Sequence, residues 1–282
     1  RYSSEFMPEG FALRDKYASR VSGVGDEMSS FDEAMFIGGT ALASKDWAKG
    51  IESYRRAIEL ARRETSKDQL GEARYRLGMA LVQSGQVEEG LKVAVELAEG
   101  EATKFSADAA GLVIASRWKE YREATSATSS ANGSASIEKV TAELRSAIER
   151  ATSRFPKSPQ AETARFLRAF LLGAEEKFEE SAAADQEVTP IAGNFAESRL
   201  RAGQMLWRAY RKKEERKESV GTLAEDARKL LQESASAFEK ERTEAAEMPI
   251  GAIEARLTEA RLLAGIGQPK EALSTAAPLV DA

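Results

Sequence analysis

Strong helix-forming residues run through almost the whole chain and are interrupted at short intervals by helix start signals. Ala, Leu, Glu, Arg and Lys dominate, and no run shows the period-two alternation of a strand. Ser30, Ser66 and Asn194 are each followed three residues later by Glu or Gln, which is the spacing of a capping box. Ser158 precedes a proline suited to the first position of a helix. The sequence therefore predicts an all-α fold with many short connections.

The expected helices repeat in pairs. Gly38 lies in the first helix of the first pair, before a turn near residues 44–46. Gly50, Tyr54 and Ala57 follow at helical spacing in the second helix. Similar patterns return further along, which indicates small residues where two helices cross and larger apolar residues between pairs. The predicted pairs cover residues 31–64, 67–100, 105–154, 158–189, 194–242 and 250–282.

The small, small, aromatic and small residues Gly38, Gly50, Tyr54 and Ala57 resemble the tetratricopeptide repeat family, whose helix–turn–helix unit has about 34 residues. The segment RFPKSPQA at 154–161 is similar to the junction between two such repeats. The resemblance implies a right-handed α-solenoid of about six stacked helix–turn–helix pairs. It also implies a protein-binding concave face lined by the first helices.

Departures from the repeat unit also carry expectations. Gly38 and Gly78 are 40 residues apart, which predicts a longer second helix or loop between them. Residues 125–136 are rich in Ser, Ala and Thr, which predicts a flexible insertion in the third pair. The first helix of the fifth pair is expected to be over-long and to run toward residues 213–217.

The expected domain organisation has two parts. Residues 1–30 are predicted to form an N-terminal segment with a short helix near 10–21, and residues 31–282 the α-solenoid. The last expected helix pair ends in an apolar stretch without a polar capping helix. Because the ends of a solenoid need such a cap, we expect the chain to be a fragment of a longer protein.

Composition removes several classes of chemistry. The 282 residues include no His and no Cys, so His-based catalysis, thiol nucleophiles, disulfides and ordinary zinc, haem or iron–sulfur sites are excluded. The abundant carboxylates follow helix faces, so no catalytic, cofactor-binding or metal-binding residue is predicted. The formal net charge of −5 argues against nucleic-acid binding. No apolar run has transmembrane length, and the compartment stays open.

A candidate protein-binding surface lies on the first helices of the first two pairs. The resemblance places Met35, Gly39, Tyr75 and Met79 on the concave face. Such a mildly apolar surface suits a helix or an extended segment of a partner. The alternative is that these residues pack under the N-terminal segment 1–30.

One binding mode of the family grips a C-terminal carboxylate with paired Asn side chains and basic residues. The chain contains only Asn132, in the expected insertion, and Asn194, at a helix start. Neither stands on a groove-lining position, so carboxylate-clamp peptide binding is excluded.

Two further groups are candidates for surface contacts. The aromatics at helical spacing are expected to pack in the core. Trp118 and Tyr121, near the expected insertion, are the candidates among them for partly exposed interface aromatics.

The basic residues Arg208, Arg211, Lys212 and Lys213 are a candidate contact for an anionic surface. Pairing with neighbouring glutamates on a solvated helix is the alternative.

The predicted function is a non-catalytic protein–protein interaction scaffold that binds another protein or other domains of the parent chain. The second hypothesis is an architectural, membrane-coat-like α-solenoid within a larger multi-domain protein, with peripheral membrane association. An enzyme that uses carboxylates is a third possibility, which the composition disfavours.

Overall fold

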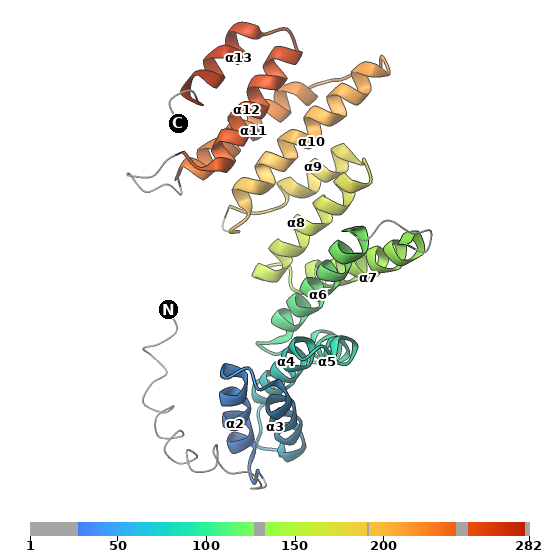
Figure 1. Cartoon of the computed structure of the whole chain (residues 1–282), viewed down its shortest axis with the longest axis vertical. Coiled ribbons are helices and arrows are strands. Elements are labelled where there is room, and N and C mark those ends of the chain that lie inside the picture. The colour runs from blue at the N-terminus through green and yellow to red at the C-terminus, as the bar shows by residue number, and fades with distance from the viewer. Residues whose placement is uncertain (1–27, 127–132, 191, 241–247, 280–282) are drawn as a thin grey trace. The chain divides into compact units, whose positions relative to one another are not determined.

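The computed structural model describes residues 28–126, 133–190, 192–240 and 248–279, and within them all regular structure is helical (Figure 1). The prediction of an all-α fold is confirmed. The helices form six successive pairs that match the predicted ones: α2 (Phe31–Ala43) and α3 (Trp47–Leu60), α4 (Lys67–Gln83) and α5 (Val87–Glu99), α6 (Ser106–Ser126) and α7 (Gly133–Arg154), α8 (Pro159–Ala174) and α9 (Phe178–Gln186), α10 (Phe195–Glu215) and α11 (Leu223–Lys240), and α12 (Ile250–Gly265) and α13 (Pro269–Ala276), followed by the 3₁₀ turn η1 (Ala277–Leu279).

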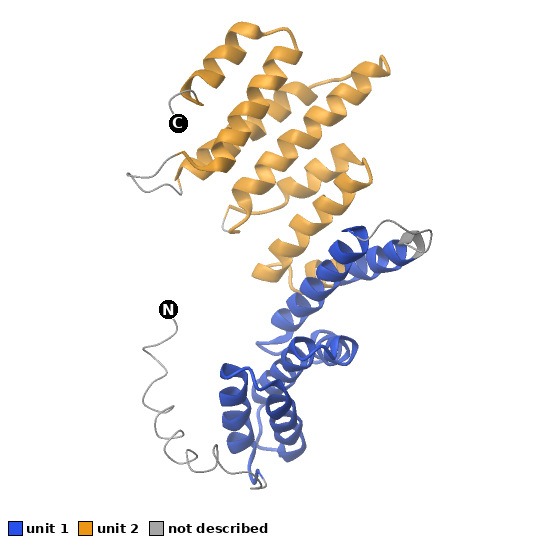
Figure 2. Ribbon diagram, in the orientation of Figure 1, with its two compact units in different colours: residues 1–147 blue, residues 148–282 orange. Residues whose placement is uncertain are grey.

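The chain divides into two compact units, residues 1–147 and residues 148–282, and the division falls inside α7 (Figure 2). Within unit 1 each helix from α2 to α6 packs against the next helix in the sequence, and α4 also contacts α6. Within unit 2 the helices from α8 to α13 do the same, and α10 also contacts α12. Stability in such a chain comes from neighbouring elements, because each pair buries its apolar faces against the elements that precede and follow it.

Two of the predicted helix starts have the expected chemistry. The Ser66 hydroxyl accepts a hydrogen bond from the Gln69 N–H, and the Gln69 side chain accepts one from the Ser66 N–H, which completes the capping box of α4. Ser158 caps α8 by accepting from the Ala161 N–H at 3.1 Å, and Pro159 takes the first helical position.

The other two starts differ in detail. Ser30 caps α2, but the Glu33 carboxylate accepts from the N–H and hydroxyl of Ser29 rather than from Ser30. The capping box predicted at Asn194 is wrong, since the Asn194 side chain makes no cap hydrogen bond although α10 begins directly after it. The backbone of Asn194, with ψ of 17°, lies outside the extended region that aims a cap side chain at the helix.

The same left-handed turn follows the first helix of five pairs. One residue in each turn has positive φ, and the N–H of the next residue donates to the carbonyl five residues before it, at 2.8–3.0 Å. This hydrogen bond is the signature of a Schellman helix end. The residues with positive φ, named here the turn residues, are Lys45, Gly85, Glu176, Lys217 and Gly267.

Small residues lie where the helices of a pair cross, as predicted. A Cβ at Gly38 would stand 2.8 Å from the Tyr54 ring, and one at Gly90 would stand 2.7 Å from the Gly78 carbonyl oxygen. A Cβ at Gly203 would stand 2.7 Å from the Leu231 side chain. These contacts require glycine, because a side chain at each position would collide with the facing helix.

The irregular segments also have physical explanations. The extra residues between Gly38 and Gly78 lie in the connection 61–66 and in α4, which has 17 residues against 13 in α2. The longer loop is therefore found, and the second helix, α3, is not lengthened. The over-long first helix of the fifth pair is confirmed by the 21 residues of α10.

Parts of two other predictions lie outside the described residues. These are the short helix near 10–21 and the central part, 127–132, of the insertion predicted at 125–136. Residues at both ends of that stretch belong to helices, since α6 runs to Ser126 and α7 begins at Gly133.

Candidate functional site

The predicted surface on the first helices of unit 1 is only partly open. Met35, Gly39, Tyr75 and Met79 are each half-buried. Met35 packs against the apolar clusters around Tyr54 and the alanines of α2 to α4. The Tyr75 ring is stacked on Phe105 at 6.0 Å, and burial raises the pKa of its hydroxyl. Packing inside unit 1 therefore uses part of each side chain and leaves the remainder at the surface.

Counting from the turn residues shows which positions of unit 2 correspond to this surface. Met35 and Tyr75 precede their turn residues by ten positions, and Gly39 and Met79 precede them by six. The sequence alone did not give this register in unit 2, because two of its three turn residues, Glu176 and Lys217, are not glycine and do not mark a turn. The corresponding residues are Phe166, Trp207 and Leu257 at the first position and Phe170, Arg211 and Arg261 at the second.

The candidate aromatic pair is brought together but is less exposed than predicted. The rings of Trp118 and Tyr121 stack with 5.4 Å between centroids, and Trp118 is half-buried. The prediction that Tyr121 is exposed is wrong, because only 9% of its surface is accessible. Tyr121 lies two helical turns after the buried Ile114 and therefore on the buried face of α6.

The basic residues near the end of α10 do not form one charged patch. Lys212 pairs with Glu176 at 2.6 Å, and Lys213 pairs with Glu179 at 2.8 Å. Both lysines are thereby neutralised across the α9–α10 contact. Exposed pairs of this kind contribute only about 0–1 kcal/mol each, but they remove the lysines from any anionic contact.

Arg208 and Arg211, in contrast, are exposed and make no side-chain hydrogen bond or ion pair within the described part of the chain. Arg261 of α12 is exposed and has no such partner there either. No signal in the sequence joins Arg261 to the arginines of α10, because it lies 50 residues after Arg211 on another helix.

These arginines stand on two helices that contact each other, α10 and α12. Gln204 donates a hydrogen bond to Glu254 at 2.9 Å, and the Trp207 ring lies directly against Gly265. Arg261 falls on the same face of α12 as Glu254 and Gly265, seven residues after the first and four before the second.

The two arginines of α10 follow Gln204 by one and two turns on the same side of that helix. We name Arg208, Arg211 and Arg261 the arginine seam.

A second charged group in unit 2 is buried. Asp185 is fully buried at the end of α9, and Arg201 of α10 donates two hydrogen bonds to its carboxylate, one of them 2.8 Å long. Arg199 donates to the carbonyl oxygens of Asp185 and Val188, which satisfies the free end of α9. Burial raises the pKa of Asp185 to about 6, although Arg201 partly opposes this shift.

The Asp185–Arg201 pair stabilises the fold and closes the carboxyl group to a substrate. Both carboxylate oxygens of Asp185 already accept from Arg201, whose guanidinium also lies 3.9 Å above the Phe166 ring. A substrate would have to displace a buried bidentate pair to reach this carboxyl group.

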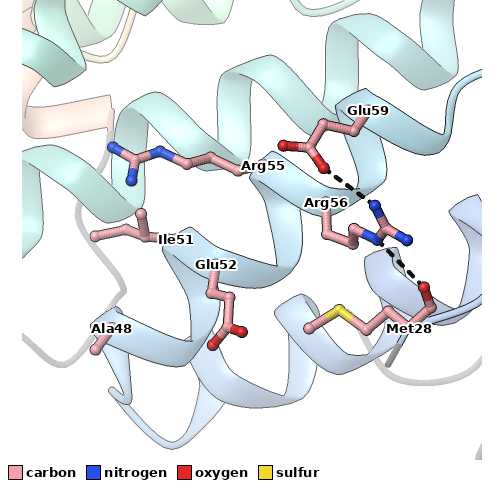
Figure 3. Close-up of a pocket in the computed structure, with 7 residues that line it drawn as sticks. All are labelled: Met28, Ala48, Ile51, Glu52, Arg55, Arg56 and Glu59. Carbon is pink, nitrogen blue, oxygen red and sulfur yellow. Dashed lines mark hydrogen bonds and ion pairs between the residues drawn. The ribbon is translucent and has the colours of Figure 1, made fainter. Parts of the chain in front are cut away.

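An open groove in unit 1 has a volume of about 510 Å³ and lies along α3 (Figure 3). Arg56 donates to the Met28 carbonyl at 3.3 Å and pairs with Glu59 at 3.2 Å, while Arg55 pairs with Glu89 of α5. Its lining residues are Met28, Ala48, Ile51, Glu52, Arg55, Arg56 and Glu59.

Two kinds of feature are absent from the described residues. No group of three or more Asp or Glu side chains there has the arrangement of a metal site. No helix among them combines the length and the apolar character needed to span a membrane.

Comparison with known proteins adds no family. No protein-family model matches the chain, and no curated protein matches it either.

Proposed function

We propose that the chain is a non-catalytic protein–protein interaction scaffold, built as a right-handed, tetratricopeptide-like stack of helix pairs. The observation that carries this proposal is the recurrence of one Schellman turn after the first helices of five pairs. Repeated supersecondary units with a constant turn are the hallmark of solenoid proteins, whose usual work is to present an extended binding surface.

The spacing of contacts between pairs supports the same proposal. Arg55 and Glu89 in unit 1 form an ion pair across 34 residues, and so do Lys67 and Glu101. In unit 2 Lys212 hydrogen-bonds to Glu176 across 36 residues. Side chains about one repeat apart are therefore neighbours, which is the pattern expected where each unit packs on its copy.

The non-catalytic part of the proposal rests on the state of the carboxylates. Asp185, whose pKa is raised to about 6, is enclosed by Arg201, and most other carboxylates stand on exposed helix faces. A general acid or base has to reach a substrate in a cleft, and of the two carboxylates that line the α3 groove, Glu59 is paired with Arg56.

The experiment uses the whole chain and a displayed library of random peptides. Selected peptides are measured by fluorescence anisotropy against Gly39→Arg, which places a long side chain on the first-helix surface. A Cβ at Gly39 has no neighbour closer than 3.9 Å, so this variant keeps the fold. Ala48→Arg, on an exposed position of α3, adds the same side chain away from that surface.

We expect Gly39→Arg to weaken peptide binding about tenfold or more and Ala48→Arg to leave it unchanged. If Ala48→Arg alone abolishes binding, the α3 groove rather than the first-helix surface is the binding site. Failure to select any peptide or protein segment with the whole chain would contradict the scaffold function.

One observation favours an architectural, coat-like role as the second candidate. Ile250 and Leu273 of the last two helices are 83% and 73% exposed, and such apolar side chains are usually covered in an assembly. Flotation with vesicles containing anionic lipid tests the membrane part. Co-flotation that disappears at high salt would support this role over the scaffold.

A further inference from the structure

The arginine seam is the strongest unexplained charge cluster in the described residues. Arg208, Arg211 and Arg261 are exposed, and no carboxylate of the described chain pairs with them. Nearby cations of the same region do have partners, since Lys212 and Lys213 pair with Glu176 and Glu179.

The fold itself holds the three arginines together. Arg211 and Arg261 stand in the last two turns of α10 and α12, four residues before each helix ends. The C-terminal end of a helix carries partial negative charge, which reduces the repulsion between cations placed there. The backbone positions of the three arginines are thus fixed on neighbouring helices before any partner binds.

An apolar contact lies beside the charges. Leu257 precedes Arg261 by one turn of α12 and is 39% exposed. Trp207 precedes Arg211 by one turn on the same side of α10 and is half-buried against Gly265. Carboxylates could pair with the guanidinium groups while an apolar side chain covers Leu257 and the edge of Trp207.

We propose that the arginine seam binds an acidic segment of a partner protein that carries an apolar residue next to its carboxylates. This inference rests on the proposed scaffold function and names the partner chemistry at one of its surfaces. Arginine suits the task, because its planar guanidinium donates to both oxygens of a carboxylate.

A peptide fits the charge distribution better than a membrane or a nucleic acid. Glu214, Glu215 and Glu218 directly follow the arginines of α10 and are exposed. A broad anionic surface would meet these carboxylates together with the arginines, whereas a narrow segment can contact the arginines alone. The net charge of −5 opposes long-range attraction of an extended polyanion more strongly than that of a short segment with few carboxylates.

The test measures fluorescence anisotropy of a short labelled peptide of alternating Glu and Gly with one central Phe. Two matched peptides replace every Glu by Lys or the Phe by Gly. The protein variants are Arg211→Glu/Arg261→Glu and, as a control with the same change in net charge, Arg63→Glu/Arg74→Glu on exposed residues of unit 1. Circular dichroism establishes that both variants fold.

We expect the acidic peptide to bind the whole chain, and the seam variant to bind it at least about tenfold more weakly than the control variant. Replacing the Phe should weaken binding further, and the Lys peptide should not bind. The affinity should fall as salt rises, because the seam is exposed.

Three results would overturn the inference. The first is equal loss in the control variant, which would mean that the overall charge of the chain, rather than the seam, sets the affinity. The second is binding of anionic vesicles or of single-stranded DNA through the seam with no binding of the acidic peptide. The third is no binding of the acidic peptide while library-selected peptides still bind the first helices of unit 1, which leaves the scaffold function intact. If neither kind of peptide binds, the scaffold function fails as well.

Discussion

Tyr54 in unit 1 and Asp185 in unit 2 occupy the same position in their helix pairs, nine residues after the turn residue, and both are fully buried. The Tyr54 ring fills its space against Gly38, whereas Asp185 is small and faces Ala169, which corresponds to Gly38. The space beside Asp185 admits Arg201 from the next pair. One backbone position thus accepts either an aromatic ring or a charged pair, provided that the facing residue compensates in volume.

The arginines beside these two positions have different ion-pair partners. Arg76 lies beside the Tyr54 hydroxyl, which has no hydrogen bond of regular geometry, and Arg76 is held instead by Glu72 of its own helix at 2.7 Å. Arg201 is held by Asp185 itself. Arg76 and Glu72 stay half-exposed beside Tyr54, whereas Asp185 is buried with Arg201, so the two positions should respond differently to mutation.

Loss of the buried Asp185–Arg201 pair is expected to have the largest effect on stability. Arg201→Ala leaves the Asp185 carboxylate buried without its partner and should lower the free energy of unfolding of unit 2 by about 3 kcal/mol or more. Arg168→Ala removes an exposed pair with Glu187 and should cost less than about 1 kcal/mol. Urea unfolding followed by Trp207 fluorescence, with the other two tryptophans replaced by Phe, measures both. Equal effects would show that burial does not distinguish the two pairs.

The second effect concerns pH. Because burial raises the pKa of Asp185 from 3.8 to about 6, the folded chain binds a proton between these values that the unfolded chain does not. The stability of unit 2 should therefore rise by a few kcal/mol at most, about 1.4 per pKa unit, as pH falls from 6 toward 4.

Asp185→Asn removes this titration and serves as its control. Relative to the variant, the unmodified chain should gain stability on acidification. A relative loss on acidification would instead mean that Arg201 holds the pKa of Asp185 below its ordinary value.

The third prediction tests the volume compensation in unit 1. Gly38→Ala places a methyl group 2.8 Å from the Tyr54 ring and should destabilise unit 1 by about 1–3 kcal/mol. Gly39→Ala has no neighbour closer than 3.9 Å and should stabilise α2 by up to about 1 kcal/mol through helix propensity. Trp47 fluorescence reports both. A stabilising Gly38→Ala would show that the ring has room to move.

The smallest effects are expected at the turns, which the two units share. Lys45→Gly relieves a positive φ of 60° and should stabilise unit 1 by about 0.5–1 kcal/mol. Glu176→Gly should gain less, because it also removes the pair with Lys212. Gly85→Ala should destabilise for the opposite reason, since φ is 91° there. Thermal unfolding of the three variants measures the order, and a neutral Lys45→Gly would contradict the strain argument.

Much of the fold could be predicted from local signals. Ser66 with Gln69, and Ser158 with Pro159, mark helix starts through hydrogen bonds within one turn, so the sequence contains all the groups involved. Asn194 marks a start correctly but makes no cap bond, since its backbone conformation depends on the preceding connection. Tyr121 was assigned to the surface because the position of a helix face relative to its neighbours is not a local property.

In the candidate sites, too, some features could be predicted from the sequence and others depended on packing. Met35, Gly39, Tyr75 and Met79 could be chosen from the repeat pattern, and their half-buried state needed the packing around them. The four basic residues of α10 read as one cluster in sequence. The structure separates them, because Lys212 and Lys213 pair with Glu176 and Glu179 whereas Arg208 and Arg211 are exposed and have no such partner among the described residues.

By itself the sequence determined an all-α chain, the order and limits of its six helix pairs, and the absence of imidazole and thiol chemistry. These properties follow from helix propensity, capping and composition, which act within a few residues. Only the tertiary structure decided that Asp185 is buried on Arg201, that Tyr121 is hidden, and that Arg261 joins the arginines of α10. Each of these depends on which side chains are opposed when helices that are distant in sequence pack together, and that register is set by the whole set of contacts.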